Sequence, residues 1–419
     1  MVKDKLKLTK YEINKNQIVY FFDSPRKLRK FYKNPDTPHL FIEYPGDCDL
    51  SKVPPAVLMV PFVSNMLTMT MLLNISIEVP ELDKTFFESL NKIKAAYKHM
   101  FPYIHFNFDV TPGNVVDNKV VEHASSLRSL FFTGGLDATS GLVEVLSSHP
   151  QEDLTLINIW GGDIATNDQS AHDRLVSYLE NLKQTLNIDY VFIRSNCREL
   201  YNERAISRLT ALKIRPWHNH GWWASIAHIL SMASLIAPFN YLRGIHCHYI
   251  SSSYETSSRT FDANNEMMVN AIKFCNCELK SLDKDLNRIQ KAKKIVNYCE
   301  RNNVKFKLKV CWYQHNGENC SQCEKCYRTI LDIIVNKGDP NLYGFNVSKD
   351  TFKEMRDFLR NNYVNVGHWH PLLNAFKRQA GYWKTQPEMS WILNTKLNRP
   401  KAIWNKGLQV LGKFKKSYK

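Results

Sequence analysis

Four of the ten cysteines fall close together and have the spacing of a metal site. They follow the pattern Cys311-x8-Cys320-x2-Cys323-x2-Cys326, so all four thiols lie within sixteen residues of chain. Four thiolates at this spacing can close a tetrahedral shell around one Zn²⁺ ion, as in structural zinc sites. An iron–sulfur cluster and four buried free thiols stay open as alternatives, because spacing alone does not exclude them. We predict zinc.

A second candidate site is the segment FFTGGLDATS, residues 131–140, where an apolar strand is expected to turn into a helix. Adjacent glycines, Gly134 and Gly135, allow positive φ and a close approach of the backbone to a ligand. Hydroxyl and backbone N–H groups at the start of a helix form a natural phosphate cradle. Asp137 is either a helix cap or a group that orders Mg²⁺ beside a nucleotide. Neither a Walker A motif nor a GxGxxG fingerprint is present.

The loop TGGLDAT resembles the SGGxDS pyrophosphate loop of the N-type ATP pyrophosphatases, the adenine nucleotide alpha hydrolase-like group. The resemblance implies that ATP binds with Mg²⁺ and is split into AMP and pyrophosphate, which adenylates a carboxylate, amide or carbonyl oxygen. Ala138 departs from the family, which has a hydroxyl there, and Thr139 points about 100° away on a helix. A non-catalytic nucleotide-binding module is therefore an alternative. The implied nucleotide contacts, with Asp137 also catalytic, are Thr133, Gly134, Gly135, Leu136, Asp137, Thr139 and Ser140.

The cysteine spacing is similar to the zinc motif of the 7-cyano-7-deazaguanine synthases, members of this group that turn a carboxylate into a nitrile using ATP and ammonia. The two motifs occur in the same order here, and the resemblance covers roughly residues 127–335, half of the chain. CEKCYRT also resembles a poorly characterised branch whose members carry an extra N-terminal segment. These similarities imply an adenylating enzyme that uses a nitrogen nucleophile and a different acceptor, either a small molecule or a protein.

Two further loops follow apolar strands and carry candidate ligand contacts. Trp160, Gly161 and Asp163 follow one strand, at the edge where parallel α/β sheets bind ligands, and would contact adenine by analogy with the family. Arg194 and Arg198 follow the next strand, where two guanidinium groups could hold the α-phosphate or an acidic substrate in a catalytic role. A tight turn with a capping aspartate and a solvated loop are equally compatible with these residues.

Three other side chains have a role only under particular hypotheses. Cys197 would serve sulfur transfer to tRNA or to a small molecule, which requires a reactive cysteine of low pKa. A lone cysteine is more often inert, so sulfur transfer is the alternative and adenylation the main hypothesis. Arg288 and Lys291 are expected on a solvated helix face, with a substrate pocket as the alternative.

The elements that must position these groups form an α/β pattern, because strands and helices alternate with short loops. The resemblance sharpens this to a doubly wound five-stranded parallel sheet of the HUP/PP-loop type. We expect three domains: a mixed α/β segment (1–125), the domain with the loop and the cysteines (126–336), and a helical extension with a basic tail (337–419). The expected strands are 129–132, 154–160, 190–195, 245–251 and an edge strand at 304–310, and the expected helices include 172–186 and 350–361.

The N-terminal segment contains 25 consecutive residues without charge, between Lys52 and Glu78. Their number would allow a membrane span, but three prolines and six Ser, Thr or Asn residues argue against one. We expect a buried strand at 56–60 running into a buried helix. Residues 18–22 and 39–44 have β character, and 82–99 has helical spacing of apolar residues.

The net charge of 56 − 40 = +16 lies at the two ends of the chain. Residues 1–33 carry a net +7, residues 384–419 a net +8, and the remainder only +1. This distribution disfavours a protein that coats nucleic acid with its whole surface and limits contact with RNA or a membrane surface to the basic termini. Scattered cysteines and the lack of a signal-peptide pattern predict a cytoplasmic protein, and a homodimer is one open oligomeric state.

Overall fold

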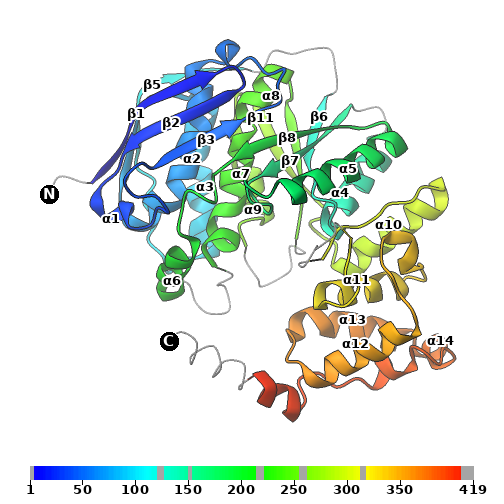
Figure 1. Ribbon diagram of the computed structural model, residues 1–419. Coiled ribbons are helices and arrows are strands. Elements are labelled where there is room, and N and C mark those ends of the chain that lie inside the picture. Colours follow the sequence, from blue (N-terminus) through cyan, green and yellow to red (C-terminus); the bar gives the residue numbers. More distant parts are fainter. Residues whose placement is uncertain are drawn as a thin grey trace. The chain divides into compact units, whose positions relative to one another are not determined.

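The computed structural model describes residues 4–119, 127–149, 153–213, 221–253, 262–311 and 318–406 (Figure 1). The chain divides into two compact units. The first comprises Met1–Thr133 and Glu144–Asp285, and the second comprises Gly134–Val143 and Leu286–Lys419. The segment TGGLDAT, residues 133–139, is called the glycine loop below. It lies at the boundary between the two units, because Thr133 ends a segment of the first unit and Gly134 begins a segment of the second.

An eleven-stranded, mostly parallel sheet forms the centre of the first unit, so the fold is α/β as expected. Its order is β10-β11-β9-β6-β7-β8-β3-β2-β1-β4-β5. The strands are β1 (Lys5–Asn14), β2 (Gln17–Asp23), β3 (His39–Glu43), β4 (Ser76–Asp83), β5 (Val110–Val116), β6 (Arg128–Phe131), β7 (Leu154–Trp160), β8 (Asp189–Ser195), β9 (Cys247–Ser251), β10 (Lys273–Phe274) and β11 (Cys277–Leu282).

The expected sheet of only five strands is wrong, although five parallel strands do lie together in the order β11-β9-β6-β7-β8. The strand order reverses between β6 and β9, and ligands of open α/β sheets bind at such a reversal, outside the carboxyl ends of the strands. The glycine loop follows β6 at this point. The N-terminal strands enlarge the sheet because β3 pairs antiparallel with β8, through Ile42 with Ser195 and Glu43 with Arg194.

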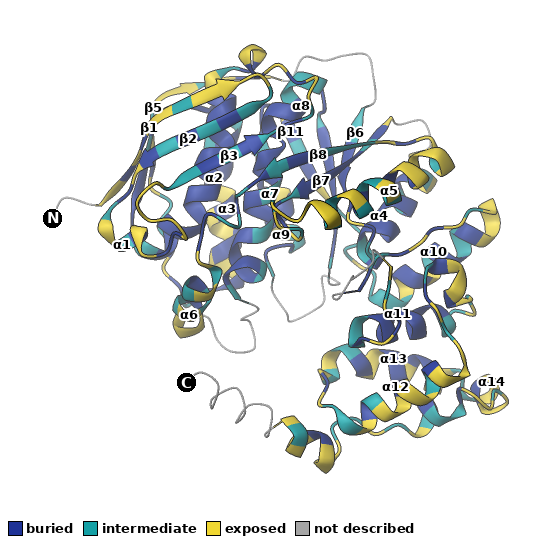
Figure 2. Cartoon of the chain, in the orientation of Figure 1, coloured by how far each residue is buried: buried dark blue, intermediate teal, exposed yellow. Residues whose placement is uncertain are grey.

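Helices and short helical turns of the first unit cover and connect these strands. They are α1 (Arg26–Arg29), η1 (Leu50–Lys52), α2 (Pro55–Leu73), α3 (Lys84–Met100), α5 (Gln169–Leu186), α6 (Glu203–Lys213), the π-helical turn η3 (Trp223–Ala227), α7 (His228–Leu235), α8 (Ala237–Arg243) and α9 (Glu266–Ala271). The strand expected at 56–60 is wrong, because α2 begins at Pro55, where proline favours the first helical turn. Every residue from Ala56 to Leu72 is buried, so no polar face marks the helical period (Figure 2).

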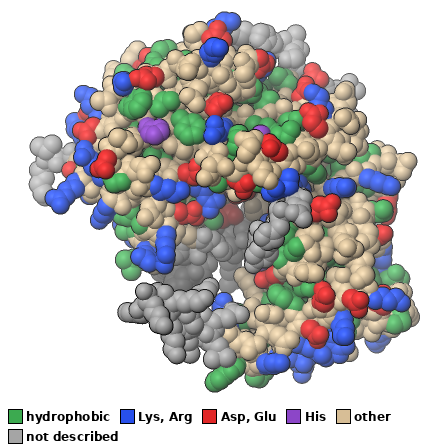
Figure 3. Space-filling model, in the orientation of Figure 1, with side chains coloured by type: hydrophobic (Ala, Val, Ile, Leu, Met, Phe, Trp, Pro, Cys, Tyr) green, Lys and Arg blue, Asp and Glu red, His purple; other side chains and the backbone are tan. Residues whose placement is uncertain are grey.

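Two apolar helical stretches, Pro55–Leu73 and Trp223–Arg243, have the length and composition of membrane spans. The apolar windows that meet this test are 94% and 83% buried in the protein. Buried core helices of soluble proteins have the same properties, so these stretches are weak evidence for a membrane. On the face drawn in Figure 3, basic and acidic side chains are interspersed over the sheet-bearing unit.

The second unit is helical. Its elements are α4 (Leu136–Ser148), which continues into the first unit after Val143, α10 (Arg288–Asn302), α11 (Glu324–Ile334), η4 (Pro340–Tyr343), α12 (Lys349–Asn361), α13 (Val366–Arg378), α14 (Ala380–Lys384) and η5 (Ser390–Asn394). The helix expected at 350–361 is confirmed by α12. The edge strand expected at 304–310 is wrong: these residues form no strand, and their N–H groups bond to turns instead, Leu308 to the Tyr343 carbonyl and Lys309 to that of Gly134.

Candidate functional site

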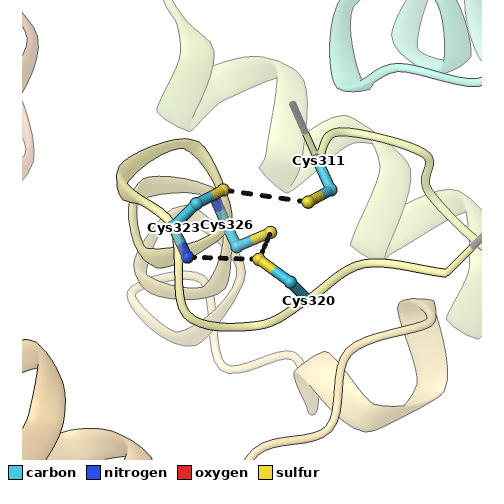
Figure 4. A group of neighbouring side chains, drawn as sticks. All are labelled: Cys311, Cys320, Cys323 and Cys326. Atoms are coloured by element: carbon cyan, nitrogen blue, oxygen red, sulfur yellow. Dashed lines mark hydrogen bonds between the residues drawn. The ribbon is translucent and has the colours of Figure 1, made fainter. Parts of the chain in front are cut away.

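The four clustered cysteines meet as their spacing predicts (Figure 4). All four Sγ atoms lie within 4.8 Å of one another, and the pairs Cys311–Cys323 and Cys320–Cys326 are each 3.9 Å apart. Four sulfurs around one tetrahedral Zn²⁺ at about 2.3 Å would be separated by about 3.8 Å. The cluster could therefore hold one metal ion such as zinc. In a cluster of several irons the cysteines bind different iron atoms, which requires a wider spread of sulfurs.

Local backbone bonds explain why the sequence brings these sulfurs together. Cys323 caps α11, because its sulfur accepts from the N–H of Cys326 at 3.5 Å. The Cys320 sulfur accepts in turn from the N–H of Cys323 at 3.3 Å. On the other side of the cluster, Asn319 accepts from the N–H of Cys311 at 3.2 Å and donates to the Leu308 carbonyl at 2.7 Å. The backbone N–H groups of Cys323 and Cys326 favour negative charge on the sulfurs, and the bonds of Asn319 hold Cys311 close to them.

The electrostatics of the cluster require a cation if the sulfurs are to ionise together. The hydrogen bond with Cys323, burial and the neighbouring thiols all raise the pKa of Cys326. Four thiolates within 4.8 Å, three of them buried and that of Cys320 exposed, repel each other strongly, and a divalent ion removes that repulsion. Soft thiolate ligands of this kind select zinc or iron over magnesium or calcium.

The glycine loop has the backbone geometry expected of a strand-to-helix turn. Gly134 has φ of +76°, in the left-handed region that glycine favours, and α4 begins at Leu136. The Gly134 carbonyl accepts from the N–H of Lys309 at 2.7 Å, which fixes the turn to the segment before Cys311. Thr133 is exposed and Gly135 is half-buried. The helix start and the glycine turn are thus where the sequence placed them.

Asp137, in the first turn of α4, forms ion pairs with two basic residues of α10. One carboxylate oxygen accepts from Nζ of Lys291 at 3.1 Å, and the other lies 3.4 Å from Nη1 of Arg288. Lys291 is fully buried, so the solvated helix face expected for it is wrong. Arg288 and Lys291 are three residues apart on α10, so they lie on the same face of that helix. Lys291 is buried together with apolar residues of α10 such as Ile295. A lysine at full burial requires a partner, and Asp137 provides one.

Polar residues of α11 extend this basic cluster. Arg288 donates to Thr329 Oγ1 at 3.1 Å, and its Nε lies 3.6 Å from the buried carboxylate of Asp332. Burial raises the pKa of Asp332 to about 6, although the charges of Arg288 and Arg328 oppose this shift. Three basic side chains, Lys291, Arg288 and Arg328, thus meet two carboxylates. Arg328, Thr329 and Asp332 lie buried on α11, the helix that follows the cysteine motif, and this burial was not predicted from the sequence.

Two hydroxyls at the start of α4 lie buried without a hydrogen bond. Thr139 and Ser140 are 1% and 0% exposed, and neither side-chain oxygen has a partner among the described residues. A buried hydroxyl left unpaired costs about 1–3 kcal/mol. Ala138, the position of the family hydroxyl, is also buried. These groups stand in the first turns of the helix whose N-terminus follows Gly134 and Gly135.

The loop after β7 holds the predicted adenine contacts. Gly161 has φ of +112°, and a Cβ there would lie 1.7 Å from the carbonyl oxygen of Ser195, so only glycine fits. The Trp160 ring stacks on His172 at 3.9 Å between centroids and also contacts the guanidinium of Arg194 at 4.7 Å. The structure therefore brings Trp160 and Arg194 together.

Both predicted arginines of this edge already have protein partners. Arg194 lies 3.3 Å from the carboxylate of Glu43 and donates to the Thr166 carbonyl at 3.2 Å. Arg198 donates to both carboxylate oxygens of Glu203, at 2.8 and 3.2 Å, and to the Gly162 carbonyl at 3.0 Å. Its guanidinium also lies 3.8 Å from Asp163. These contacts hold the loops after β7 and β8, and a catalytic role for either arginine stays a prediction.

Comparison with family models and with curated proteins does not assign the chain to a family. No protein-family model and no curated protein matches the chain. The likeness of the glycine loop and the cysteine spacing to the ATP pyrophosphatases therefore stays a prediction, and function has to be inferred from the chemistry of the side chains.

Proposed function

We propose that this protein is an ATP-dependent adenylating enzyme of the PP-loop ATP pyrophosphatase type. It splits ATP into AMP and pyrophosphate and activates a carboxylate, amide or carbonyl oxygen for attack by a nitrogen nucleophile. The acceptor is a small molecule or a protein. The observation that carries the proposal is the basic cluster at the glycine loop, where Lys291 and Arg288 meet Asp137 beside the start of α4.

The cluster has the chemistry of a pyrophosphate site. Among the described residues, three basic and two acidic side chains form the cluster, and buried positive charge is costly unless an anion compensates it. The N–H groups at the start of α4 and the unpaired hydroxyls of Thr139 and Ser140 add donors of the kind that phosphates accept. A triphosphate would take over the basic groups that now meet Asp137, which frees that carboxylate for the Mg²⁺ that accompanies ATP.

The contribution of the protein to the reaction would be positioning and charge stabilisation. Lys291 and Arg288 would neutralise the leaving pyrophosphate, which gathers negative charge as the substrate oxygen attacks the α-phosphate. Thr139 is the residue that could supply the loop hydroxyl missing at Ala138. Zinc, held by the four clustered cysteines, would supply structure rather than chemistry, because a closed Cys₄ shell leaves no position for substrate.

The cysteines favour adenylation over sulfur transfer. Burial raises the pKa of Cys197 to about 12, which removes the thiolate that sulfur transfer would need near neutral pH. All ten cysteines lie among the described residues and none forms a disulfide bond, as expected in a reducing compartment, so we place the enzyme in the cytoplasm.

Pyrophosphate release from ATP, measured across a panel of candidate acceptors, tests the proposal. We expect Lys291→Met to lower ATP affinity at least tenfold and to abolish pyrophosphate release. Lys293→Met, an exposed lysine on the same helix, should match the wild type. If the wild-type protein binds ATP but forms no AMP with any acceptor, the proposal of an enzyme is wrong, and the protein is a non-catalytic nucleotide-binding module.

A further inference from the structure

A cavity of about 350 Å³ lies near the β11 edge of the sheet in the first unit. Residues of β6, β9 and β11 line it, together with α9 and the residue after α4. None of the lining residues belongs to the glycine loop or to the cysteine cluster. The cavity is therefore a separate candidate site, and it has no role in the function proposed above.

Strand register places the charged and apolar lining residues on one face of the sheet. Tyr249 of β9 pairs with Lys280 of β11. Arg128 of β6 pairs with Cys247, which lies two residues before Tyr249 on β9. Because side chains alternate along a strand, Arg128, Tyr249 and Lys280 project to the same side, as does Leu282. Tyr249 also stacks against His149, with ring planes 15° apart. The cavity thus has an apolar wall with cationic groups beside it.

The charges that line the cavity favour an anion. Three cations, Arg128, Lys280 and Lys284, face one carboxylate, Glu266, which lies 2.7 Å from Lys284. The net charge of the described lining residues is 3 − 1 = +2. Lys280 also pairs with Glu278 at 2.7 Å outside the cavity, and Glu278 in turn with Lys273 at 3.7 Å. Counting Lys273 and Glu278, together with Asp285, whose charge acts on Lys284, gives 4 − 3 = +1 over the described residues, so a positive excess persists.

We propose that this cavity binds a small phosphate ester. Arg128, Lys280 and Lys284 would hold the phosphate, whose charge of about −2 matches the net lining charge, since arginine and lysine both bind phosphate oxygens. The organic part would pack on Tyr249 and Leu282. The volume is at the lower end of the range for small-molecule pockets, which suits a phosphorylated sugar rather than a larger ligand.

Calorimetric titration of the full chain with ribose 5-phosphate tests the site, with ribose and inorganic phosphate as comparison ligands. We expect saturable binding of ribose 5-phosphate, weaker binding of inorganic phosphate and none of ribose. Arg128→Gln and Lys280→Gln should each weaken binding at least tenfold, whereas Lys273→Gln, outside the cavity, should change it less than twofold. Glu266→Gln should tighten binding, because it raises the net lining charge to +3.

The tightening by Glu266→Gln separates the proposal from misfolding, which can only weaken binding. Absence of saturable binding to the wild type would overturn the site. If Lys273→Gln and Lys280→Gln weaken binding equally, the binding reflects general surface charge and not a specific site, which contradicts the proposal. If inorganic phosphate binds as tightly as the ester, the proposed contacts to the organic part are wrong. If Arg128→Gln and Lys280→Gln leave the affinity unchanged, the phosphate does not bind in this cavity.

Discussion

The backbone N–H of Lys309 donates a 2.7 Å hydrogen bond to the carbonyl oxygen of Gly134. Lys309 stands two residues before Cys311, the first ligand of the cysteine cluster, and Gly134 is the positive-φ residue of the glycine loop. One bond thus joins the segment that enters the candidate metal centre to the turn that would bind phosphate. The order of the metal centre and the geometry of the loop should depend on each other.

Loss of one metal ligand should therefore weaken ATP binding. We expect Cys323→Ser to lower the metal content and to reduce ATP affinity at least tenfold, because α11 begins after this residue and its Thr329 holds Arg288. Metal analysis and calorimetry measure the two quantities. Cys299→Ser, a buried cysteine of α10 outside the cluster, should retain both. Metal loss with unchanged ATP affinity would show that the two sites are independent.

Thr139→Val should separate stability from binding. The Thr139 hydroxyl is buried without a partner, so removing it should leave the free energy of unfolding unchanged or raise it by up to about 1 kcal/mol. If the hydroxyl serves the nucleotide, ATP affinity should fall about tenfold in the same variant. Urea unfolding and ATP titration give the two numbers, and Thr139→Ser, which keeps the hydroxyl, should preserve the ATP affinity. A variant that binds ATP as well as the wild type would exclude Thr139 from the nucleotide site.

Gly161→Ala should destabilise the first unit by at least about 3 kcal/mol. The new Cβ would meet the Ser195 carbonyl in a backbone conformation that alanine rarely adopts. Gly46→Ala is the matched control, because no atom lies within 4 Å of a Cβ at Gly46. Denaturant unfolding should show a lower midpoint for the first variant only. Equal midpoints would mean that the loop after β7 rearranges without cost.

Asp332 should make stability depend on pH. Burial raises its pKa from 3.8 to about 6, so the folded protein holds a proton that the unfolded chain has lost between these values. The contribution of Asp332 to the free energy of unfolding then falls, by up to about 3 kcal/mol, as the pH rises from 4 to 6. Unfolding of the wild type and Asp332→Asn across this range should show the difference, and parallel pH curves would contradict it.

Much of the parallel part of the fold could be predicted from sequence. The strand expected at 154–160 is β7, and those at 190–195 and 129–132 agree with β8 and β6 to within one residue. These runs are apolar and end at turn-forming residues. By contrast, α2 is buried on every side, so its first turns, residues 56–60, were mistaken for a strand, although a buried helix was expected after them. The pairing of β3 with β8 joins residues some 150 positions apart, which no local pattern records.

The candidate sites divide in the same way. The four cysteines were predictable, because metal ligands leave a local spacing that few other patterns share. The partnership of Asp137 with Lys291 was not, because it joins two helices separated by about 150 residues, and a lysine on a helix is usually solvated. Burial of the lysine becomes visible only when the tertiary structure is known.

The antiparallel pairing of β3 with β8 also covers the carboxyl end of the β8 edge, at Arg194 and Ser195. Without the N-terminal strands, β8 would expose unpaired N–H and C=O groups along the border of a parallel sheet, and such borders pair with other chains. Asn196 continues the seam with its side chain, which accepts from the N–H of Phe41 at 2.9 Å and donates to the carbonyl of His39 at 2.9 Å. The N-terminal strands thus cover the carboxyl end of the β8 edge and extend the sheet beyond it.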